Sequence, residues 1–426
     1  MKQQVIKNER LKEQYYSFEH ETGLKILLYP MKGYRSCYAL FGTNLGSIDT
    51  TFKTDGDQDY TIVPEGVAHF LEHKLFESED GDAFSLFAKT GASANAFTSF
   101  EKTCYLFSAT NQIEESLASL LKFVQEPYFT QQTVEKEQGI IGQEIRMYQD
   151  DPEWRVFFNL LGALYQKNPV RIDIAGTEES IARIDAELLY KCYHTFYNLN
   201  NMVLAVAGNF DVEAALKVIE NGLKPSQKVQ VYHQVPEEPK EICTSKVEQN
   251  LSVSTPLFQI GFKEQVLEGL EQLKTQIATE IILDVLAGEA SPFYRRLYDT
   301  GLINQTFGYE VFTGRGYFAN IFSGESKDPE VVFTQLKQEI QALKQQGITQ
   351  AEFTRCKKCL YGHMVRRFNN VEGVALNLVS SYFAGVDIYD SVGIIEQLTL
   401  QEVNEVLKNS LKEEFAAISI VNPVKE

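Results

Sequence analysis

The sequence predicts an α+β fold built from two homologous domains. Its 426 residues exceed what one hydrophobic core usually supports. In each half, short strand-like runs are followed by longer stretches with helical periodicity, in the same order. The repeat is also visible in the letters, because FSLFAKTGA from Phe84 and YRRLYDTGL from Tyr294 carry Thr-Gly at the same offset. We therefore expect each half to form a mostly antiparallel sheet packed against helices.

The first half begins with strand patterns. In order, it predicts strands over 25–30 and 37–49, one helix over 64–91 opened by Pro64, strands over 93–100 and 102–110, helices over 111–126 and 130–149, and an apolar strand within 200–211. The helix over 130–149 should stop before Pro152, because the residue before a proline disfavours the helical conformation.

The second half repeats this order. It predicts a strand over 255–262, a helix over 271–288, strands over 306–312 and 317–325, and then long helices, with the segment 291–303 between the first helix and the later strands. Between the halves, residues 226–247 are polar, contain prolines and lack clear periodicity, which is typical of a linker. The predicted organisation is a first domain over 1–225, a linker over 226–247 and a second, homologous domain over 248–426.

Composition excludes several classes of function. The net charge of −18 without clustered Lys and Arg disfavours nucleic-acid binding. The sequence has no run of 18 apolar residues and a polar N-terminal stretch, so we expect no membrane span, no secretory signal and a cytoplasmic location. The six cysteines are scattered, which favours reduced thiols, and the lone pair Cys356 and Cys359 lacks the partners of a metal site.

The segment HFLEH is the candidate catalytic motif. On a helix, His69 and His73 at i and i+4 share a face and can direct two imidazoles at one ion. Glu72 lies on the same side, free to accept a proton. This order inverts the better-known HExxH motif. The simplest alternative is a polar helix edge without a metal, but with six histidines in the chain a chance HxxEH is expected only on the order of once in a hundred such chains.

A third ligand has to come from another segment. Glu144 is the best candidate, in a helical stretch that also holds Glu137 seven residues earlier, so both carboxylates face the same way. One would bind the metal and the other support it. Two neutral histidines and one carboxylate leave such a site positive enough to lower the pKa of a bound water towards ~7. Glu72 would then take the proton as the water attacks a peptide carbonyl.

Three segments together carry a family resemblance. HFLEHKLFES, GASANAFTSFEKTCYLF and EKEQGIIGQEIRMYQDDP resemble the pitrilysin/insulinase family of inverzincin zinc metallopeptidases, and in particular its bacterial branch similar to mitochondrial processing peptidase. The resemblance extends through RIDIAGTEESI and FYNLNNMVLAVAGNFD, and the second half matches mainly in layout. It implies a chain that forms half of a clam-shell chamber and binds one zinc ion.

The resemblance also implies a role for individual residues. His69, His73 and Glu144 would be the zinc ligands, Glu72 the base and Glu137 the supporting carboxylate. The strand SANAFTSF would be an exposed edge to which a peptide substrate adds, with Asn95, Ala96 and Phe97 beside the scissile bond. Without the resemblance, this segment could equally be an ordinary strand with a buried Phe97.

The second half departs from the first. Alignment on the shared Thr-Gly places Thr279, Ile282 and Leu283 opposite the HxxEH residues, so no second metal site is expected. In the family that the chain resembles, catalytic relatives that work alone or as symmetric pairs tend to carry an arginine and a tyrosine seven residues apart in this half, where the present chain has Leu297 and Asn304. We therefore expect a heterodimer with a non-catalytic paralogue that supplies the missing Arg/Tyr pair.

Three functions remain open from the sequence. The first is a zinc endopeptidase for small or unfolded peptides, with a role in precursor-peptide processing. The second is a non-catalytic peptide-binding or structural subunit of the same family. The third is a zinc hydrolase of small-molecule amides. The intact set of four site residues favours an enzyme, and the strand edge SANAFTSF favours a peptide substrate.

Overall fold

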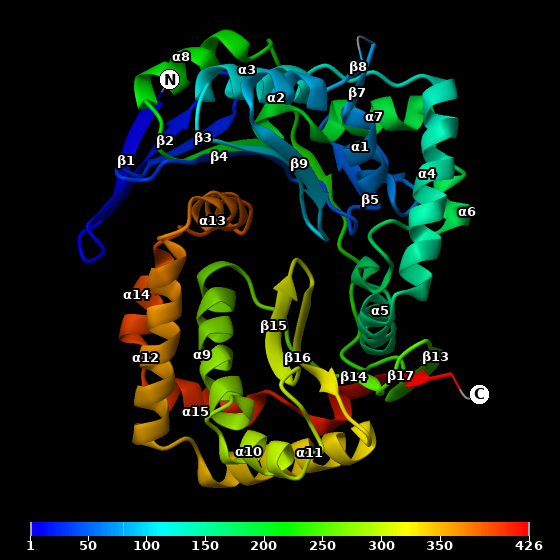
Figure 1. Ribbon diagram of the computed structural model, residues 1–426, viewed down its shortest axis with the longest axis vertical. Helices are drawn as coiled ribbons and strands as arrows, with labels where there is room; N and C mark the ends of the chain where they lie inside the picture. The colour runs from blue at the N-terminus through cyan, green and yellow to red at the C-terminus, as the bar shows by residue number, and fades with distance from the viewer. Residues whose placement is uncertain (1, 80, 425–426) are drawn as a thin grey trace. The chain divides into compact units, whose positions relative to one another are not determined.

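The computed structural model describes residues 2–79 and 81–424, and the chain divides into two compact units. Unit 1 comprises the chain up to Ile145, Asp173–Gln234 and Val365–Tyr389. Unit 2 comprises Arg146–Ile172, Val235–Met364 and the chain from Asp390. Each unit contains its own sheet and its own layer of helices (Figure 1).

The centre of unit 1 is a seven-stranded sheet. Its strand order is β1-β2-β3-β11-β4-β10-β9, in which the β3–β11 pair is parallel and the other pairs are antiparallel. The strands are β1 (Lys2–Asn8), β2 (Glu13–Glu19), β3 (Lys25–Pro30), β4 (Cys37–Thr43), β9 (Ser93–Thr98), β10 (Thr103–Ala109) and β11 (Met202–Gly208). A small sheet of β12 (Val231–His233), β5 (Thr51–Thr54) and β6 (Thr61–Ile62) lies in the same unit.

Helices cover both faces of this sheet. Figure 1 shows α13 on one face of β4 and α3 on the other. The helices of unit 1 are α1 (Val67–Leu75), α2 (Phe84–Thr90), α3 (Ile113–Val124), most of α4 (Gln131–Asp150), α6 (Glu178–Ile181), α7 (Ala186–Phe196), α8 (Val212–Gly222) and α13 (Val371–Phe383). Because both faces are covered, the central strands are buried along their whole length, as β4 and β11 are.

Unit 2 repeats the core of the first sheet. Its order is β13-β17-β14-β16-β15, with the β13–β17 pair parallel and the other pairs antiparallel. This reproduces the order and directions of β3-β11-β4-β10-β9, which confirms the prediction of two homologous α+β halves with mostly antiparallel sheets. The strands are β13 (Lys246–Leu251), β14 (Leu257–Lys263), β15 (Gly308–Gly314), β16 (Tyr317–Glu325) and β17 (Ala416–Pro423).

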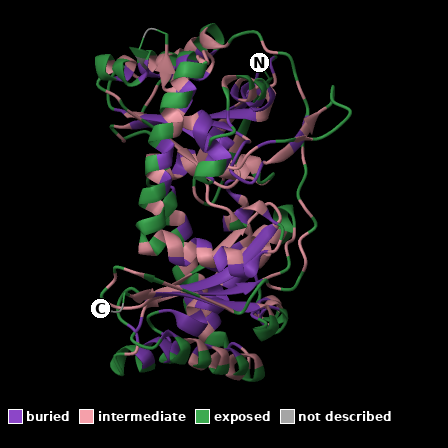
Figure 2. Cartoon of the chain, turned by 90° about the vertical axis from the view of Figure 1, so that its right-hand side faces the viewer, coloured by how far each residue is buried: buried purple, intermediate pink, exposed green. Residues whose placement is uncertain are grey.

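The helices of unit 2 pack around this sheet. They are α5 (Pro152–Leu164), α9 (Gly269–Ala287), α10 (Pro292–Asp299), α11 (Pro329–Gln346), most of α12 (Gln350–Arg367), α14 (Asp390–Gln397) and α15 (Leu400–Asn409). Buried residues are concentrated in the strands (Figure 2). In the part of the chain that the structure describes, no helix is both long and apolar enough to cross a bilayer.

The shared Thr-Gly has the same structural role in both halves. It ends a short helix, because Gly91 after α2 and Gly301 after α10 both adopt left-handed conformations, with φ of 70° and 68°. The preceding threonines also match: Thr90 Oγ1 donates to the carbonyl of Phe87 at 3.0 Å, and Thr300 Oγ1 to that of Leu297 at 3.0 Å. The repeat in the letters is therefore a repeated helix C-terminus.

Each sheet is covered on one face by a helix from the other half of the sequence. Helix α5 precedes the predicted linker but packs on β14 and β17, whereas α13 follows it and packs on β4 and β11. Both helices meet a glycine of the central strand. A Cβ on Gly42 would lie 3.0 Å from Val379 Cγ1, and one on Gly261 would lie 2.7 Å from Leu164 Cδ1. Each compact unit therefore includes a helix from the other half of the sequence, so the units are not the two contiguous sequence repeats. The domain boundaries predicted at 225 and 248 stay a prediction.

The single helix predicted over 64–91 is wrong. Helix α1 ends at Leu75 and α2 begins at Phe84, and between them Glu77–Ser78 (β7) pairs with Gly81–Asp82 (β8). Gly81 has a φ of 124°, which a helix cannot contain. The start of α1 also lies later than Pro64, at the left-handed Gly66, where a Cβ would lie 2.3 Å from the carbonyl oxygen of Ala175.

The predicted linker is anchored by side chains. At its start, β12 pairs with β5. Further on, the Glu238 carboxylate accepts hydrogen bonds from the backbone N–H groups of 166–168, each at 2.8 Å, and from Lys263 Nζ at 2.6 Å. Burial alone would raise the pKa of Glu238, but these donors hold it below its usual value.

Candidate metal centre

The candidate site lies in unit 1, where α1 faces α4. Buried Phe70 and Leu71 anchor α1 to the core, so the opposite side of the helix carries His69, Glu72 and His73. Helix α4 carries Glu137 and Glu144 two turns apart, and it stops before Pro152, as predicted. Asp151 caps the next helix by accepting from the N–H groups of Glu153 and Trp154.

Ligand atoms of His69, His73 and Glu144 all lie within 4.8 Å of one another. Glu144 Oε2 is 3.7 Å from His69 Nε2 and 3.5 Å from His73 Nε2. These separations are long for hydrogen bonds, but two ligands of a tetrahedral Zn²⁺ with bonds of roughly 2.0–2.2 Å lie about 3.4 Å apart. The donor set of two imidazoles and one carboxylate therefore fits a zinc ion.

The protonation state of His69 favours metal binding, and the tautomer of His73 leaves Nε2 towards Glu144. Burial, and to a lesser extent the neighbouring His73, lower the pKa of His69 to about 3, so the ring is neutral at pH 7 with a free lone pair. His73 is 2.9 Å from Glu137 Oε1 through Nδ1. Because a carboxylate can only accept, Nδ1 carries the hydrogen and Nε2 faces Glu144.

Glu137 thus orients the ring of His73, and its role as the supporting carboxylate of a metal site stays a prediction. Burial alone would lower the pKa of His73, but the hydrogen bond to Glu137 and the nearby carboxylates raise it above its usual value. Burial would likewise raise the pKa of Glu137, yet its bond to His73 holds it below the usual range. Glu137 therefore stays ionised and fixes the ring tautomer of His73.

Glu72 is a largely buried carboxylate beside this cluster. Burial raises its pKa, and a hydrogen bond from Thr98 Oγ1 at 2.7 Å partly offsets the shift. Thr98 ends the strand β9, and its Oγ1 also lies 3.4 Å from Thr103 Oγ1. The candidate base is therefore hydrogen-bonded to the strand predicted to hold the substrate.

Strand β9 forms the edge of the seven-stranded sheet, as predicted, with β10 on its other side. Asn95 is exposed, whereas Ala96 and Phe97 are partly buried. The Ala96 N–H donates to the side-chain Oδ1 of Asn95 at 2.9 Å. Phe97 lies opposite Cys104 in the register with β10. At this edge, the backbone N–H of Ala96 is therefore already hydrogen-bonded to the side chain of the neighbouring Asn95.

The second half has no such cluster at the corresponding positions. Thr279, Ile282 and Leu283 are buried in the core around α9. In the part of the chain that the structure describes, no second group of three potential metal ligands has its ligand atoms within 4.8 Å of one another. Cys356 is buried and Cys359 exposed, and both are free thiols. The expectation of a single metal site per chain stays a prediction.

Thr98 is a site residue that the sequence reasoning missed. Strand alternation contains the signal, because Ala94, Ala96 and Thr98 share one face of β9 and Asn95 and Phe97 the other. A threonine near the end of that strand, on one face with Ala96, could have been recognised as a partner for the base. Its identity as the partner of Glu72 depends on the packing of α1 against β9.

A mostly antiparallel sheet beside a His-His-Glu cluster on two helices defines a class of metallopeptidase fold. The family model described as Insulinase (Peptidase family M16) matches residues 62–178, and the model described as Peptidase M16 inactive domain matches residues 183–360. The chain therefore belongs to the insulinase family, peptidase family M16.

Relatives with this architecture occur in several bacteria. The chain is 38% identical to the "Uncharacterized zinc protease YmfH" of Bacillus subtilis, over 98% of this chain and 99% of that protein. A crystal structure described as an M16-like peptidase from Alicyclobacillus acidocaldarius superposes with a TM-score of 0.94 at 33% identity, covering 98% of this chain and all (100%) of the other. A protease from Helicobacter pylori shares the fold alone, with a TM-score of 0.82 at 17% identity over 96% of this chain and 100% of the other.

Proposed function

We propose that this chain is a zinc-dependent endopeptidase that cleaves small or unfolded peptides, including segments of precursor peptides. The observation that carries the proposal is the convergence of His69, His73 and Glu144 at separations suited to one zinc ion. The carboxylate of Glu72 lies beside them, and Thr98 in the edge strand β9 donates a hydrogen bond to it. Names of relatives such as the YmfH protein support zinc as the metal.

The four residues would divide the chemistry between binding and proton transfer. His69, His73 and Glu144 would hold zinc, which lowers the pKa of a bound water towards ~7 and polarises a carbonyl oxygen. Glu72 would accept the proton of the attacking water as the carbon–oxygen bond forms. It would then pass that proton to the amine nitrogen as the peptide bond breaks. Glu137 would keep the ring of His73 in the tautomer that leaves Nε2 free.

The free edge of β9 would hold the substrate. An extended peptide can add to an exposed strand through backbone hydrogen bonds, without a requirement for particular side chains. The Ala96 N–H would then donate to a substrate carbonyl in place of Asn95 Oδ1. This exchange would release the Asn95 amide to contact the peptide. Such recognition favours extended, unfolded segments over folded proteins and over small-molecule amides.

Glu72→Gln tests the proposed chemistry. We expect the native chain and the variant each to bind one zinc ion, measured by metal analysis, because the substitution removes no metal ligand. Cleavage of a peptide library should fall by roughly 10²–10⁴ in the variant, the contribution usual for a general base. Cleavage that survives the substitution would remove Glu72 from this role. Absence of both zinc and cleavage in the native chain would favour a non-catalytic subunit.

The chain would act with a non-catalytic paralogue that supplies the Arg/Tyr pair. The two positions expected for this pair are engaged otherwise: Leu297 is buried in the core, and Asn304 donates to Glu325 Oε2 at 2.6 Å and accepts from Thr306 N–H at 2.9 Å. Activity per chain should therefore rise on addition of the paralogue and fall on dilution of the pair. Full activity of the purified chain, unchanged by dilution, would contradict the heterodimer.

A further inference from the structure

Unit 2 contains a pocket that the proposed peptidase chemistry does not use. Its volume is about 620 Å³, within the range of pockets that bind small molecules. The walls come from the ends of β14 and α15, one face of α9, the β16 strand and the segment 236–240. All lining residues belong to unit 2, whereas the His-His-Glu cluster belongs to unit 1.

Some charged groups of the pocket are already saturated. Lys263 Nζ donates to Glu238 Oε1 at 2.6 Å and to the carbonyls of Pro239 and Glu241 at 2.7 and 3.3 Å. An ammonium group has three donors, so Lys263 has none left. Glu238 in turn accepts from that lysine and from three backbone N–H groups. This pair holds the linker in place and is not available to a ligand.

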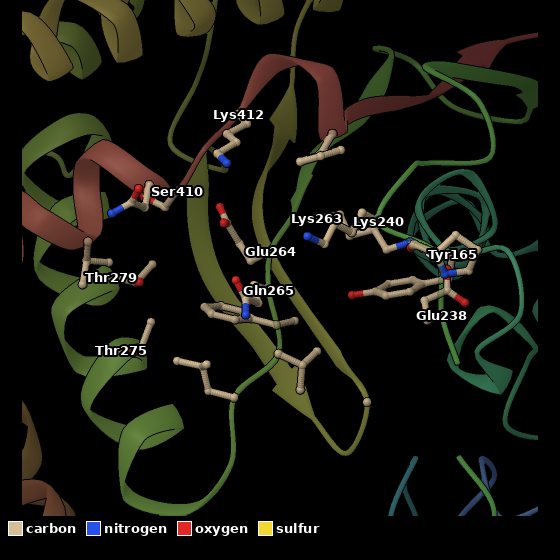
Figure 3. Close-up of a pocket in the computed structure, with 18 of the residues that line it drawn as sticks. Tyr165, Glu238, Lys240, Lys263, Glu264, Gln265, Thr275, Thr279, Ser410 and Lys412 are labelled. Carbon is tan, nitrogen blue, oxygen red and sulfur yellow. Dashed lines mark hydrogen bonds and ion pairs between the residues drawn. The ribbon is translucent and has the colours of Figure 1, made fainter. Parts of the chain in front are cut away.

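Three other polar groups of the pocket are incompletely bonded, of which Thr279 and Ser410 are buried and Glu264 is partly buried. Glu264 Oε1 accepts from Leu411 N–H at 2.7 Å and from Asn320 Nδ2 at 2.9 Å, whereas no described residue donates a hydrogen bond to its Oε2. Thr279 and Ser410 are exposed by only 1% and 6%, and the hydroxyl of neither has a hydrogen-bond partner among the described residues. Figure 3 shows all three groups on one side of the pocket.

The turn at Ser410 and Leu411, which donates a backbone hydrogen bond to Glu264, is strained. Leu411, whose N–H binds Glu264, has a φ of 49°, a left-handed conformation that is unfavourable for a branched side chain. Lys344 Nζ donates to the carbonyls of Ser410 and Leu411 at 2.6 and 3.2 Å. The partly buried carboxylate of Glu264 and the ammonium group of Lys344 therefore hold together a turn that local preference disfavours.

The remaining walls of the pocket consist of two exposed lysines and a largely apolar surface. Lys240 and Lys412 are exposed, and no ion pair joins either of them to another described side chain. Figure 3 shows Lys240 across the pocket from Thr279. The rest of the lining is largely apolar and includes Val266, Leu267 and Phe318. A carboxylate oxygen with hydroxyls suits an ammonium group, free lysines suit a carboxylate, and the apolar wall suits a hydrocarbon side chain.

We propose that this pocket binds a small zwitterion with an apolar side chain, either a free amino acid or a dipeptide. Glu264, Thr279 and Ser410 accept the three hydrogens of its ammonium group. Lys412 or Lys240 pairs with its carboxylate, and Val266, Leu267 and Phe318 contact its side chain. Binding at this site needs no zinc, so the inference does not rest on the proposed peptidase activity.

Calorimetric titration of the full chain tests this site. The chain should carry Glu72→Gln and be dialysed against EDTA, so that no metal is bound and no peptide is cleaved. We expect one mole of L-leucine or of L-leucyl-L-leucine to bind per chain, and the tighter of the two identifies the ligand size. N-acetyl-leucine and leucinamide, which lack one charge each, should bind roughly tenfold or more weakly, since each loses a charged hydrogen-bonded pair.

Two substitutions locate the binding within the pocket. Glu264→Gln and Thr279→Val should each raise the Kd roughly tenfold, whereas Glu405→Gln at the rim, a matched charge control, should leave it unchanged. Thr279→Val keeps the shape of the side chain and provides a second test if Glu264→Gln alters folding. The inference is overturned if neither ligand binds, if N-acetyl-leucine binds as tightly as leucine, or if both pocket variants retain the native Kd.

Discussion

The hydroxyl of Thr98 is the contact that joins the edge strand to the buried carboxylate of Glu72. Thr98→Val keeps the shape of the side chain and removes the donor. We expect kcat to fall roughly tenfold or more with little change in KM, because a hydrogen bond to a charged group contributes about 1.5–3 kcal/mol and each ~1.4 kcal/mol is tenfold in rate. Steady-state kinetics with one peptide substrate measures both constants.

Thr98→Ser is the matched control, since it restores the hydroxyl. It should recover most of the rate, and both variants should bind zinc as the native chain does. A merely structural role for Thr98 would instead lower the rate of both variants alike or reduce their zinc content.

Glu137 also acts through another residue, by holding His73 Nδ1 at 2.9 Å. Glu137→Gln should weaken zinc binding by about 10–100-fold, the usual effect of losing a partner of a ligating histidine. Competition with a chelator of known affinity measures this change. Glu135→Gln on the same helix is the control, because Glu135 is exposed and bonds Gln131 Nε2 at 3.0 Å. Equal losses in the two variants would remove the positioning role of Glu137.

Glu264 makes the stability of the chain depend on pH. Burial raises its pKa to about 7 from 4.5, although the bonds from Leu411 and Asn320 and the charges of Lys344 and Lys412 oppose the shift. Between these two pH values the folded chain binds more protons than the unfolded chain, so the free energy of unfolding falls as pH rises through this window. A shift of this size corresponds to a loss of about 3 kcal/mol above pH ~7.

Glu264→Gln should remove this loss of unfolding free energy at high pH. Urea unfolding at pH 8 should show the variant to be more stable than the native chain, and at pH 5 the difference should largely disappear. An advantage of the same size at both pH values would indicate a packing effect and contradict the role of ionisation.

At the scale of elements, strand β9 offers the sharpest test. Ala96→Pro removes the backbone N–H that now donates to Asn95 Oδ1, on the side of the strand away from its β10 partner. A proline with its ring towards the free edge is tolerated in an edge strand, so the fold should persist. Peptide cleavage should fall at least about tenfold, and Ala96→Ser, which keeps the N–H, should remain active. Full activity of the proline variant would exclude pairing of substrate with Ala96.

The sequence predicted the elements that carry the candidate site, but it did not predict the strands β1, β2 and β17, and it missed the turn between α1 and α2. Strands β4, β9 and β10 and the end of α4 were predictable because alternation and proline act locally. The break between α1 and α2 was not, since Phe76 and Phe84 stack with ring centroids 4.4 Å apart and so continue the apolar pattern across the hairpin. The apolar periodicity indicates which residues are buried. Because it continues across the hairpin, it gives no sign of the turn at Gly81 that separates the two helices.

For the whole molecule, the exchange of α5 and α13 could not be predicted, because an apolar helix face does not specify the sheet that it covers. The four candidate ligand and base residues could be named from the sequence, since all lie on two local helical patterns. The contact between Glu72 and Thr98, like the helix exchange, depends on tertiary packing. The exchange has a consequence for stability, because each half of the sequence lacks one covering helix of its own sheet.

A fragment of residues 1–225 should therefore fail to fold alone. It lacks α13, whose buried Val374, Leu378 and Val379 pack in the core of unit 1, with Val379 against Gly42 of β4. Exposing such side chains removes about 1.5–3 kcal/mol each, a large part of the 5–15 kcal/mol that stabilises a typical domain. The fragment should lack a cooperative thermal transition and should not bind zinc stoichiometrically. Co-expression with residues 226–426 should restore both, because that fragment contributes α13. A fragment 1–225 that unfolds cooperatively on its own would show that α13 is dispensable to the first sheet.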